Sequence, residues 1–365
     1  MKRVLPFLLV FCAASATAQR VIHAWSQGRF GYVYGGLIKT EPSGNVYVAG
    51  TTTTTTSSDV ILTKYSAAGA VLWSIQYDGG YHLKDVVIAM TVDAAGNVYL
   101  TGTTVNNTMY SDTYIITRKY SSTGSLIWSA TYGLREFNSS PTDIAVDGSG
   151  NAYVVGYKGI PPVNERYPLI LKFNASGVLE WEQSVGTTPF LQHAGVVQDN
   201  SGNIYVAGLE PTNPIYGSNS FTTFKFNATG TLLWQRSYSV PNRQVQVKAI
   251  KLDINGDILV AGISGGSGFF GYTYGIAYVK YSPAGTQLLA ASIADVGATG
   301  PNIGGNVYLA TDVAGNVYLA ATSTDKGSVR HSNVLIAQYS VTGRRNWLVE
   351  YNHSGTSNDV VSGVA

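Results

Sequence analysis

Two short motifs recur along the chain, and their period constrains the fold more than any other feature of the sequence. The first is a Gly-Asn or Gly-Asp step followed by alternating aliphatic residues and tyrosine. Its copies begin 52 to 59 residues apart, at Gly44, Gly96, Gly150, Gly202, Gly256 and Gly315. The second is Lys-Tyr/Phe-x-x-x-Gly-x-x-x-Trp, with its glycines at Gly69, Gly124, Gly177, Gly230, Gly285 and Gly343. Self-similarity at such a period indicates one supersecondary unit repeated along the chain.

One copy of the repeat, beginning at Asp85, shows the four strands that we expect in each copy. Residues 85–92 form an apolar run, and residues 97–102 alternate with period two, which places successive side chains on opposite faces of a sheet. Residues 113–120 and 125–132 follow as the third and fourth strands. The Asp-x-x-Gly and x-x-x-Gly steps between strands predict tight turns, where Asp bonds its own backbone and Gly supplies a positive φ.

Four-stranded antiparallel units of this length predict an all-β chain, a β-propeller whose blades repeat radially. An open solenoid is the alternative, but its coils are usually shorter and rarely hold four strands. One position of the fourth strand carries a large apolar residue, which can fill the wedge between diverging blades. The residues at this position are Trp73, Trp128, Trp181, Trp234, Leu289 and Trp347.

The pattern D-x-x-G-N-x-Y-V-x-G followed by K-Y-x-x-x-G-x-x-x-W resembles the SBBP-type β-propeller repeats of bacterial exported proteins. The resemblance covers essentially the whole chain after residue 18. It implies the propeller fold and an extracytoplasmic location, and it implies no particular reaction, because members are typically functionally unassigned. Leu289 replaces the tryptophan of the fifth copy and Gln338 the lysine of the sixth, so we expect looser packing between blades at these positions.

The first 18 residues have the pattern of a secretory signal peptide. Lys2 and Arg3 are followed by an apolar run at 4–14 and by the cleavage sequence Ala-Thr-Ala at 16–18. The apolar run is too short to span a membrane. Cys12 would suit a lipoprotein signal, but the bulky Phe11 before it argues against one. We therefore expect residues 19–365 to form a secreted or cell-surface propeller domain, not embedded in a membrane.

Both ends of the propeller domain carry single strands of the repeat. Val21–Gln27 resembles a fourth strand, with Trp25 at the tryptophan position, and Asp359–Ala365 resembles the beginning of a first strand. A propeller usually completes one blade from both ends of the chain, because this removes two free edges. We therefore predict six complete blades plus a partial seventh, in a chain truncated within a repeat. The full-length product would then be seven-bladed and extend about 30 residues further, judged from the repeat period.

The charge balance argues against a nucleic-acid partner. Cleavage after residue 18 removes two of the 23 basic residues, which leaves 21 basic against 21 acidic residues and a formal charge of zero. A nucleic-acid binder needs a basic surface. The only cysteine leaves with the signal peptide, so no disulfide is expected. The blades and their packing must therefore supply the stability, and the oligomeric state stays open.

Polar residues that return in nearly every copy are most simply structural. An aspartate precedes the glycine of the first motif in five copies, at Asp93, Asp147, Asp199, Asp253 and Asp312. Calcium takes about six to eight oxygen ligands, so one carboxylate per turn favours turn formation over a metal site. The lysines of the second motif, Lys64, Lys119, Lys172, Lys225 and Lys280, are expected on the blade surface. We predict neither a metal site nor a cofactor.

The loops at one end of the blades are expected to carry the function. The turns joining strands one to two and three to four are short and uniform, whereas the loops joining strands two to three and successive blades vary in length and composition. Variable loops on a rigid scaffold are where binding usually occurs. Their aromatic rings suit a carbohydrate or a protein ligand, although loop tyrosines can also simply pack locally. The predicted ligand-binding residues are Tyr81, His82, Asp85, Arg135, Glu136, Phe137, His193, Tyr216, Phe269, Phe270 and Tyr272.

The sequence favours a non-catalytic binding protein, and two alternatives stay open. No H-E-x-x-H or G-x-S-x-G motif occurs. Two of Glu136, Glu165 and Glu210 could serve as the carboxylate pair of an extracellular glycoside hydrolase or polysaccharide lyase. The Gly124-x-x-x-Trp128 step also resembles the tryptophan-docking motif of quinone-dependent dehydrogenase propellers, without a recognisable cofactor site. A structural surface spacer is the third reading.

Overall fold

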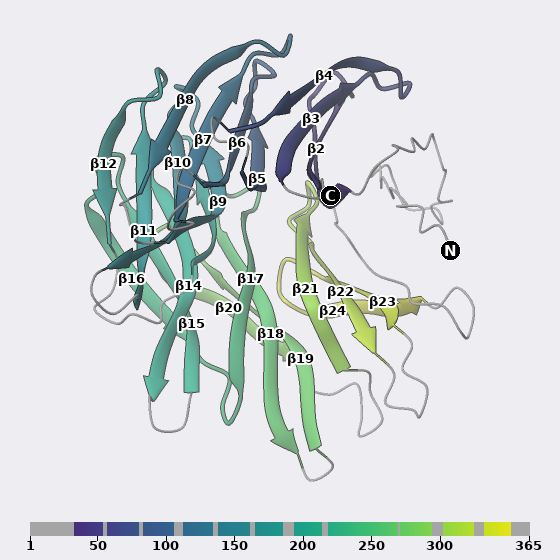
Figure 1. The fold of residues 1–365 in the computed structure, drawn as a ribbon. Helices are drawn as coiled ribbons and strands as arrows, with labels where there is room; N and C mark the ends of the chain where they lie inside the picture. Colours follow the sequence, from purple (N-terminus) through teal and green to yellow (C-terminus); the bar gives the residue numbers. More distant parts are fainter. Residues whose placement is uncertain are drawn as a thin grey trace. The chain divides into compact units, whose positions relative to one another are not determined.

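The described residues of the computed structural model fold into β-strands only, and they contain no helix (Figure 1). They are residues 33–53, 57–79, 83–105, 112–133, 138–160, 165–184, 193–213, 218–268, 271–293, 302–324 and 332–351. The predicted signal peptide and the end strands Val21–Gln27 and Asp359–Ala365 lie outside them. The seven-blade prediction therefore stays a prediction.

Twenty-four strands form six antiparallel sheets of four, and the described part of the chain divides into two compact units with three sheets each. The first unit holds β1 (Val33–Thr40), β2 (Val46–Thr53), β3 (Ser58–Tyr65), β4 (Val71–Tyr77), β5 (Asp85–Val92), β6 (Val98–Val105), β7 (Thr113–Tyr120), β8 (Leu126–Tyr132), β9 (Ser139–Val146), β10 (Ala152–Ile160), β11 (Glu165–Phe173) and β12 (Leu179–Gln183).

The second unit repeats the same four-strand pattern three times. It holds β13 (His193–Gln198), β14 (Ile204–Asn213), β15 (Ser218–Phe226), β16 (Leu232–Tyr238), β17 (Gln244–Leu252), β18 (Ile258–Gly268), β19 (Gly271–Tyr281), β20 (Gln287–Ile293), β21 (Asn302–Thr311), β22 (Val317–Thr324), β23 (Ser332–Tyr339) and β24 (Arg345–Tyr351). Neighbours in the sequence are neighbours in every sheet. The predicted all-β fold of four-stranded blades is confirmed, and the blades are numbered one to six below.

The Asp-x-x-Gly turns form as predicted, with the aspartate at their centre. In blade two, Oδ1 of Asp93 accepts the backbone N–H groups of Ala95 at 3.0 Å and Asn97 at 2.8 Å. Its Oδ2 accepts the Asn97 side-chain amide at 2.9 Å and the Tyr99 hydroxyl at 3.2 Å. Gly96 has a φ of 76°, a conformation that costs glycine little. Both carboxylate oxygens therefore accept hydrogen bonds within the turn, which agrees with the structural role predicted from the repetition of this aspartate.

Within each unit, the tryptophan of one blade packs on the second-motif glycine of the next. The ring of Trp128 lies so close to Gly177 that a β-carbon there would be 2.6 Å from it. Its Nε1–H donates to the carbonyl of Ala175 in the same turn at 3.1 Å, and the residue is 8% exposed. Trp73 makes the same pair of contacts with Gly124 and Ser122. The predicted wedge between blades is therefore filled by a side chain that docks on a turn.

In the fifth blade, leucine keeps the contact of the tryptophan and loses its hydrogen bond. A β-carbon on Gly343 would lie 2.2 Å from Cδ1 of Leu289, so the leucine fills the same place against the turn of blade six. Its side chain has no N–H to donate. Contact between these two blades therefore depends on apolar packing alone at this position.

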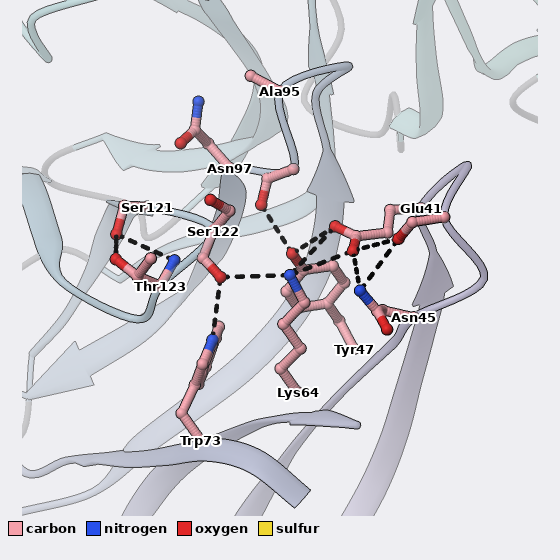
Figure 2. A network of polar contacts seen from close by, with 12 residues as sticks. Glu41, Asn45, Tyr47, Lys64, Trp73, Ala95, Asn97, Ser121, Ser122 and Thr123 are labelled. Carbon is pink, nitrogen blue, oxygen red and sulfur yellow. Dashed lines mark hydrogen bonds and ion pairs between the residues drawn. The ribbon is translucent and has the colours of Figure 1, made fainter. Parts of the chain in front are cut away.

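The prediction that the repeated lysines lie on the blade surface is wrong for four of them. Lys64, Lys119, Lys172 and Lys280 are 4–9% exposed. In blade one, Nζ of Lys64 lies 4.8 Å from the centre of the Tyr47 ring and donates to the Ser122 carbonyl of the next blade at 3.2 Å (Figure 2). The aliphatic stem can be buried because the ammonium finds an aromatic face, a carbonyl and the Glu41 carboxylate, 3.2 Å away, at its tip.

Candidate functional site

Asp85 is the predicted ligand-binding residue whose side chain the structure describes. The predicted residues that have no described position are Tyr81, His82, Arg135, Glu136, Phe137, Tyr216, Phe269 and Phe270. His193 begins β13 and Tyr272 lies in β19, and only their backbone is described. The predictions for all these residues stand as they were made. The loop-rich end of the blades is therefore described outward from Asp85.

Asp85 begins β5 and joins three segments at the contact between blades one and two. It lies opposite Thr104 of β6, and its Oδ2 accepts the backbone N–H of Gly79 at 2.6 Å, just beyond the end of β4. Its backbone carbonyl accepts the hydroxyl of Ser58, the first residue of β3, at 3.1 Å. The residue is 1% exposed. Asp85 thus ties the last strand of one blade to the first strand of the next.

The environment of Asp85 favours its protonated form. Burial raises the pKa of the carboxyl above its ordinary value, and the negative charges of Asp78 and Asp59 add to this. The Thr104 hydroxyl and the Gly79 amide lower the pKa, but they do not outweigh burial. Oδ1 accepts no hydrogen bond of normal geometry from the described residues. A buried carboxyl at the loop-rich end therefore carries an unusual proton affinity.

A cation and an aromatic ring lie at the same contact. The guanidinium carbon of Arg118 in β7 is 3.4 Å from the centre of the Tyr77 ring in β4, and its Nη1 donates to the Tyr120 hydroxyl at 3.1 Å. Burial raises the pKa of Tyr77, and Arg118 works against that rise while Asp85 adds to it. Arginine on an aromatic face is a favourable arrangement. The contact between the first two blades therefore holds an acid, a phenol and a cation.

The residues of this contact depart from the repeat. Arg118 directly precedes the repeated lysine, where the other copies have Thr63, Leu171, Phe224, Val279 and Ala337. Asp85 lies eight residues before the turn acid, where blades one, three and five have Val33, Ser139 and Val245. Asp85 is among the ligand-binding residues predicted from the sequence, and Arg118 is not. A comparison of each strand position across the six copies would have singled out this arginine.

Two carboxylates at the loop-rich end of blades in the second unit form hydrogen bonds within their own blades. Oε2 of Glu210 accepts the Thr222 hydroxyl at 3.2 Å and the Gln235 amide at 2.9 Å. Oε1 of Glu350 accepts the Ser323 hydroxyl at 2.7 Å and the Asn333 amide at 3.0 Å. Each of these acids therefore joins neighbouring strands through neutral donors. Among the described residues, no three His, Cys, Asp or Glu side chains gather in a way that could hold a metal ion.

The sequence of blades two and three matches a known repeat. Residues 127–157 match the family model named SBBP, a beta-propeller repeat. The matched SBBP segment runs from β8 through the turn at Asp147 into β10, so it contains one whole copy of the first motif and Trp128, the last residue of the second motif. No curated protein matches the chain. The SBBP resemblance inferred from the motifs is confirmed for this segment.

Solved structures share the fold at low sequence identity. A PL25 ulvan lyase bound to -[GlcA(1-4)Rha3S]- is 11% identical with a TM-score of 0.53, over 87% of this chain and 83% of the lyase. A protein of unknown function from Dyadobacter fermentans is 11% identical with a TM-score of 0.50, over 83% of this chain and 94% of that one. The GH93 alpha-L-arabinofuranosidase of Fusarium graminearum, with arabinobiose, is 10% identical with a TM-score of 0.50, over 74% and 82%. At these identities the likeness concerns the fold alone.

Proposed function

We propose that this chain is a non-catalytic protein that binds carbohydrate through the loop-rich end of its blades. The observation that carries the proposal is the contrast between the two ends of the blades. At one end, the Asp-x-x-Gly turns repeat the same set of hydrogen bonds. At the other, the connections between the second and third strands differ in length and composition from blade to blade. Variable residues on a constant scaffold are the arrangement that recognition of a ligand requires.

The structural neighbours support a carbohydrate over another ligand. The titles of two of them name a sugar ligand, an ulvan fragment for the lyase and arabinobiose for the arabinofuranosidase. The predicted loop residues are rich in aromatic rings, which give sugars flat contact area. A protein ligand would use the same surface and is the alternative occupant.

A polysaccharide array that includes arabinan and ulvan tests this proposal directly. We expect retention of at least one polysaccharide, with no release of reducing ends or unsaturated products over a day of incubation. Retention of proteins from a surface extract with no polysaccharide retained would favour the protein ligand. The absence of any retained partner would leave the structural spacer.

An extracellular hydrolase or lyase is the second candidate function, because the ulvan lyase and the arabinofuranosidase share the fold. Such an enzyme would need two carboxyls, or a carboxyl and a base, within reach of the same sugar, and Glu136, Glu165 and Glu210 are the candidates. Turnover of an array polysaccharide that is lost when one of these acids is changed to its amide would establish this function in place of simple binding.

We also propose that the protein is exported, from the signal peptide pattern of residues 1–18. No described segment forms a helix long and apolar enough to cross a membrane. N-terminal sequencing of the protein recovered from culture medium should give Gln19 as the first residue. Recovery of a lipid-modified Cys12 would contradict this.

A further inference from the structure

In blade five, a buried lysine contacts the turn acid. In blades two, three, four and six, a tyrosine hydroxyl donates to that acid instead. In blade five, Leu259 takes the place of the tyrosine, and Asp257 takes the place of the asparagine that follows the glycine. Nζ of Lys280 lies 2.7 Å from Oδ2 of Asp253 and 2.9 Å from Oδ2 of Asp257. The amine therefore lies against two carboxyl groups at once.

This cluster is shielded from water. The side chains of Lys280, Asp253 and Asp257 are 4%, 0% and 14% exposed. Leu259, which pairs with Lys280 between β18 and β19, is fully buried. Burial disfavours the charged forms of an amine and a carboxyl, and so favours the neutral pair relative to water. An amine and a carboxyl held in contact can condense to an amide there, because the water that would reverse the reaction is excluded.

The two oxygens of the Asp253 carboxyl have different surroundings. Oδ1 accepts the backbone N–H groups of Asn255 at 2.8 Å and Asp257 at 3.0 Å. Oδ2 accepts no hydrogen bond of normal geometry from the described residues, although Nζ of Lys280 is in contact with it. Two N–H groups on one oxygen stabilise the negative charge that develops there when a nucleophile attacks the carbon. One oxygen is therefore anchored, and the other is available as a leaving group.

Asp257 lies where a proton acceptor is needed. Burial lowers the pKa of Lys280, but hydrogen bonds and charge from Asp253 and Asp257 outweigh burial and raise it, so the resting cluster holds an ammonium. The amine becomes a nucleophile once Nζ passes on a proton, and Oδ2 of Asp257 is 2.9 Å away. In blade two the same position is Asn97, whose side-chain amide donates to Asp93 and is no base.

We propose that Lys280 and Asp253 form a modification site, at which they condense to an isopeptide bond within blade five. Nζ gives up two of its three hydrogens, which Asp257 relays to Oδ2 of Asp253. The new C–N bond forms at Cγ of Asp253, the bond from Cγ to Oδ2 breaks, and that oxygen leaves as water. The reaction needs no oxidant or other co-reactant, and the net charge of the cluster is unchanged.

The bond ties β19 to the turn between β17 and β18. The single cysteine of the chain lies in the predicted signal peptide, so a disulfide cannot supply such a tie in the propeller domain. This inference is independent of the proposed binding function.

Peptide mass spectrometry of the wild-type protein detects the bond directly. No lysine or arginine lies between Lys251 and Lys280, so trypsin should release residues 252–280 if Lys280 is unmodified. We expect cleavage after Lys280 to fail instead, which gives a peptide that extends to Lys326 and weighs one water less than its sequence. Chymotrypsin, which cuts at the aromatic residues between Asp253 and Lys280, should then leave two fragments joined through these side chains.

Two variants and an internal control assign the roles. Lys280→Arg keeps a cation without an amine, so its peptide should keep full mass. Asp257→Asn keeps the amine and the attacked carboxyl but removes the proton acceptor. The joined fraction, followed over time after expression, should rise about a hundredfold more slowly in this variant, the usual effect of losing a general base. Lys119 of blade two, which is also buried, should be cleaved normally at full mass.

A wild-type peptide of full mass that is cleaved after Lys280 would overturn the proposal. Loss of water without joined fragments would also overturn it, because that result marks a cyclic imide between an aspartate and its own backbone. Equally fast joining in Asp257→Asn would overturn the role of Asp257 as the proton acceptor. The decisive measurement uses the wild-type protein, so it does not depend on whether the variants fold.

Discussion

Blades two and five supply the donor to the carboxylate of the turn acid from different residues. In blade two, the Tyr99 hydroxyl donates to the turn acid Asp93, and Lys119 lies 4.9 Å from the centre of the Tyr99 ring. In blade five, leucine replaces this tyrosine at position 259. There Lys280 reaches the turn itself, with its Nζ 2.7 Å from Oδ2 of Asp253.

A second acid in the turn of blade five accompanies this change. Asp257 takes the place of the usual asparagine, and its Oδ2 lies 2.9 Å from Nζ of Lys280. Burial lowers the pKa of this lysine, but hydrogen bonds and charge from Asp253 and Asp257 outweigh burial and raise it. The comparison teaches that the turn acid needs donors on both oxygens, which either a tyrosine hydroxyl or a lysine can supply. Substitutions at these positions are therefore coupled.

The largest expected effect is that of removing the lysine from blade five. Lys280→Ala leaves Asp253 and Asp257 without a cation, and breaking such a buried pair costs about 3–5 kcal/mol. Lys119→Ala in blade two loses a contact with an aromatic face, worth about 0.5–2 kcal/mol. Urea unfolding of both variants measures the difference. Equal losses would contradict the claim that the two lysines have different roles.

The next effect concerns the docking of tryptophan between blades. Trp128→Ala should cost about 3–5 kcal/mol, because the ring is 8% exposed and packs on the turn of blade three. Trp347 is 40% exposed, so Trp347→Ala should cost clearly less. The midpoint of urea unfolding compares them. If the midpoint in Trp128→Ala stays at the wild-type value, the ring does not hold the blades together.

A smaller effect should appear at acid pH, where blade one extends the comparison with Glu41 in the place of the turn acid. Burial raises the pKa of this carboxyl, but hydrogen bonds from Ser43, Asn45, Tyr47 and Lys64 together lower it to about 2. Figure 2 shows Asn45, Tyr47 and Lys64 converging on the carboxylate. The folded pKa is below the unfolded one, so this stability is present above the unfolded value of 4.5 and is lost as pH falls toward 2.

Glu41→Gln is the variant that tests the acid-pH effect. At pH 7 it should cost about 1.5–3 kcal/mol, the usual worth of a hydrogen bond to a charged group. Its thermal midpoint should then fall less between pH 6 and pH 3 than that of the wild type. A parallel fall in the two proteins would show that Glu41 is not responsible for the acid sensitivity.

The smallest effect is the coupling itself. Asn97→Asp in blade two imports the second acid of blade five and should cost about 1 kcal/mol, because two carboxylates then share one turn. Adding Tyr99→Leu removes the ring beneath Lys119 and frees the lysine to bridge both acids. A double-mutant cycle should give a favourable coupling of about 0.5–1 kcal/mol. Additive losses would show that the blade-five residues cannot be transplanted as a set.

Most of the blade architecture could be predicted from the sequence, and the reason is repetition. The apolar run beginning at Asp85 and the third strand ending at Tyr120 have the bounds of β5 and β7. The burial of Lys64 could not be predicted, because its partner Ser122 belongs to the next blade and is invisible to any single-copy pattern. Arg118 was missed because one polar residue in an apolar strand gives no periodic signal.

The candidate site was predictable only in outline. Asp85 was found because it opens a strand beside a variable loop, yet its burial follows from Thr104 in β6 and from Gly79 just beyond β4, which are distant from each other in the sequence. The remaining predicted ligand residues belong to loops that differ in each copy. Repetition, which specifies the strands, carries no information about such loops.

The docking of Trp128 on Gly177 has a consequence for how such chains can lengthen. The projecting side chain and the receiving turn belong to opposite faces of the repeating unit, so blades two and five each carry one half of two unlike contacts. A duplicated blade therefore already carries both the tryptophan and the receiving turn that its two neighbours require. Stability in such arrays is approximately a sum of unit and nearest-neighbour contributions. Insertion of a whole unit then requires no compensating substitution elsewhere, whereas loss of one glycine disables a single joint.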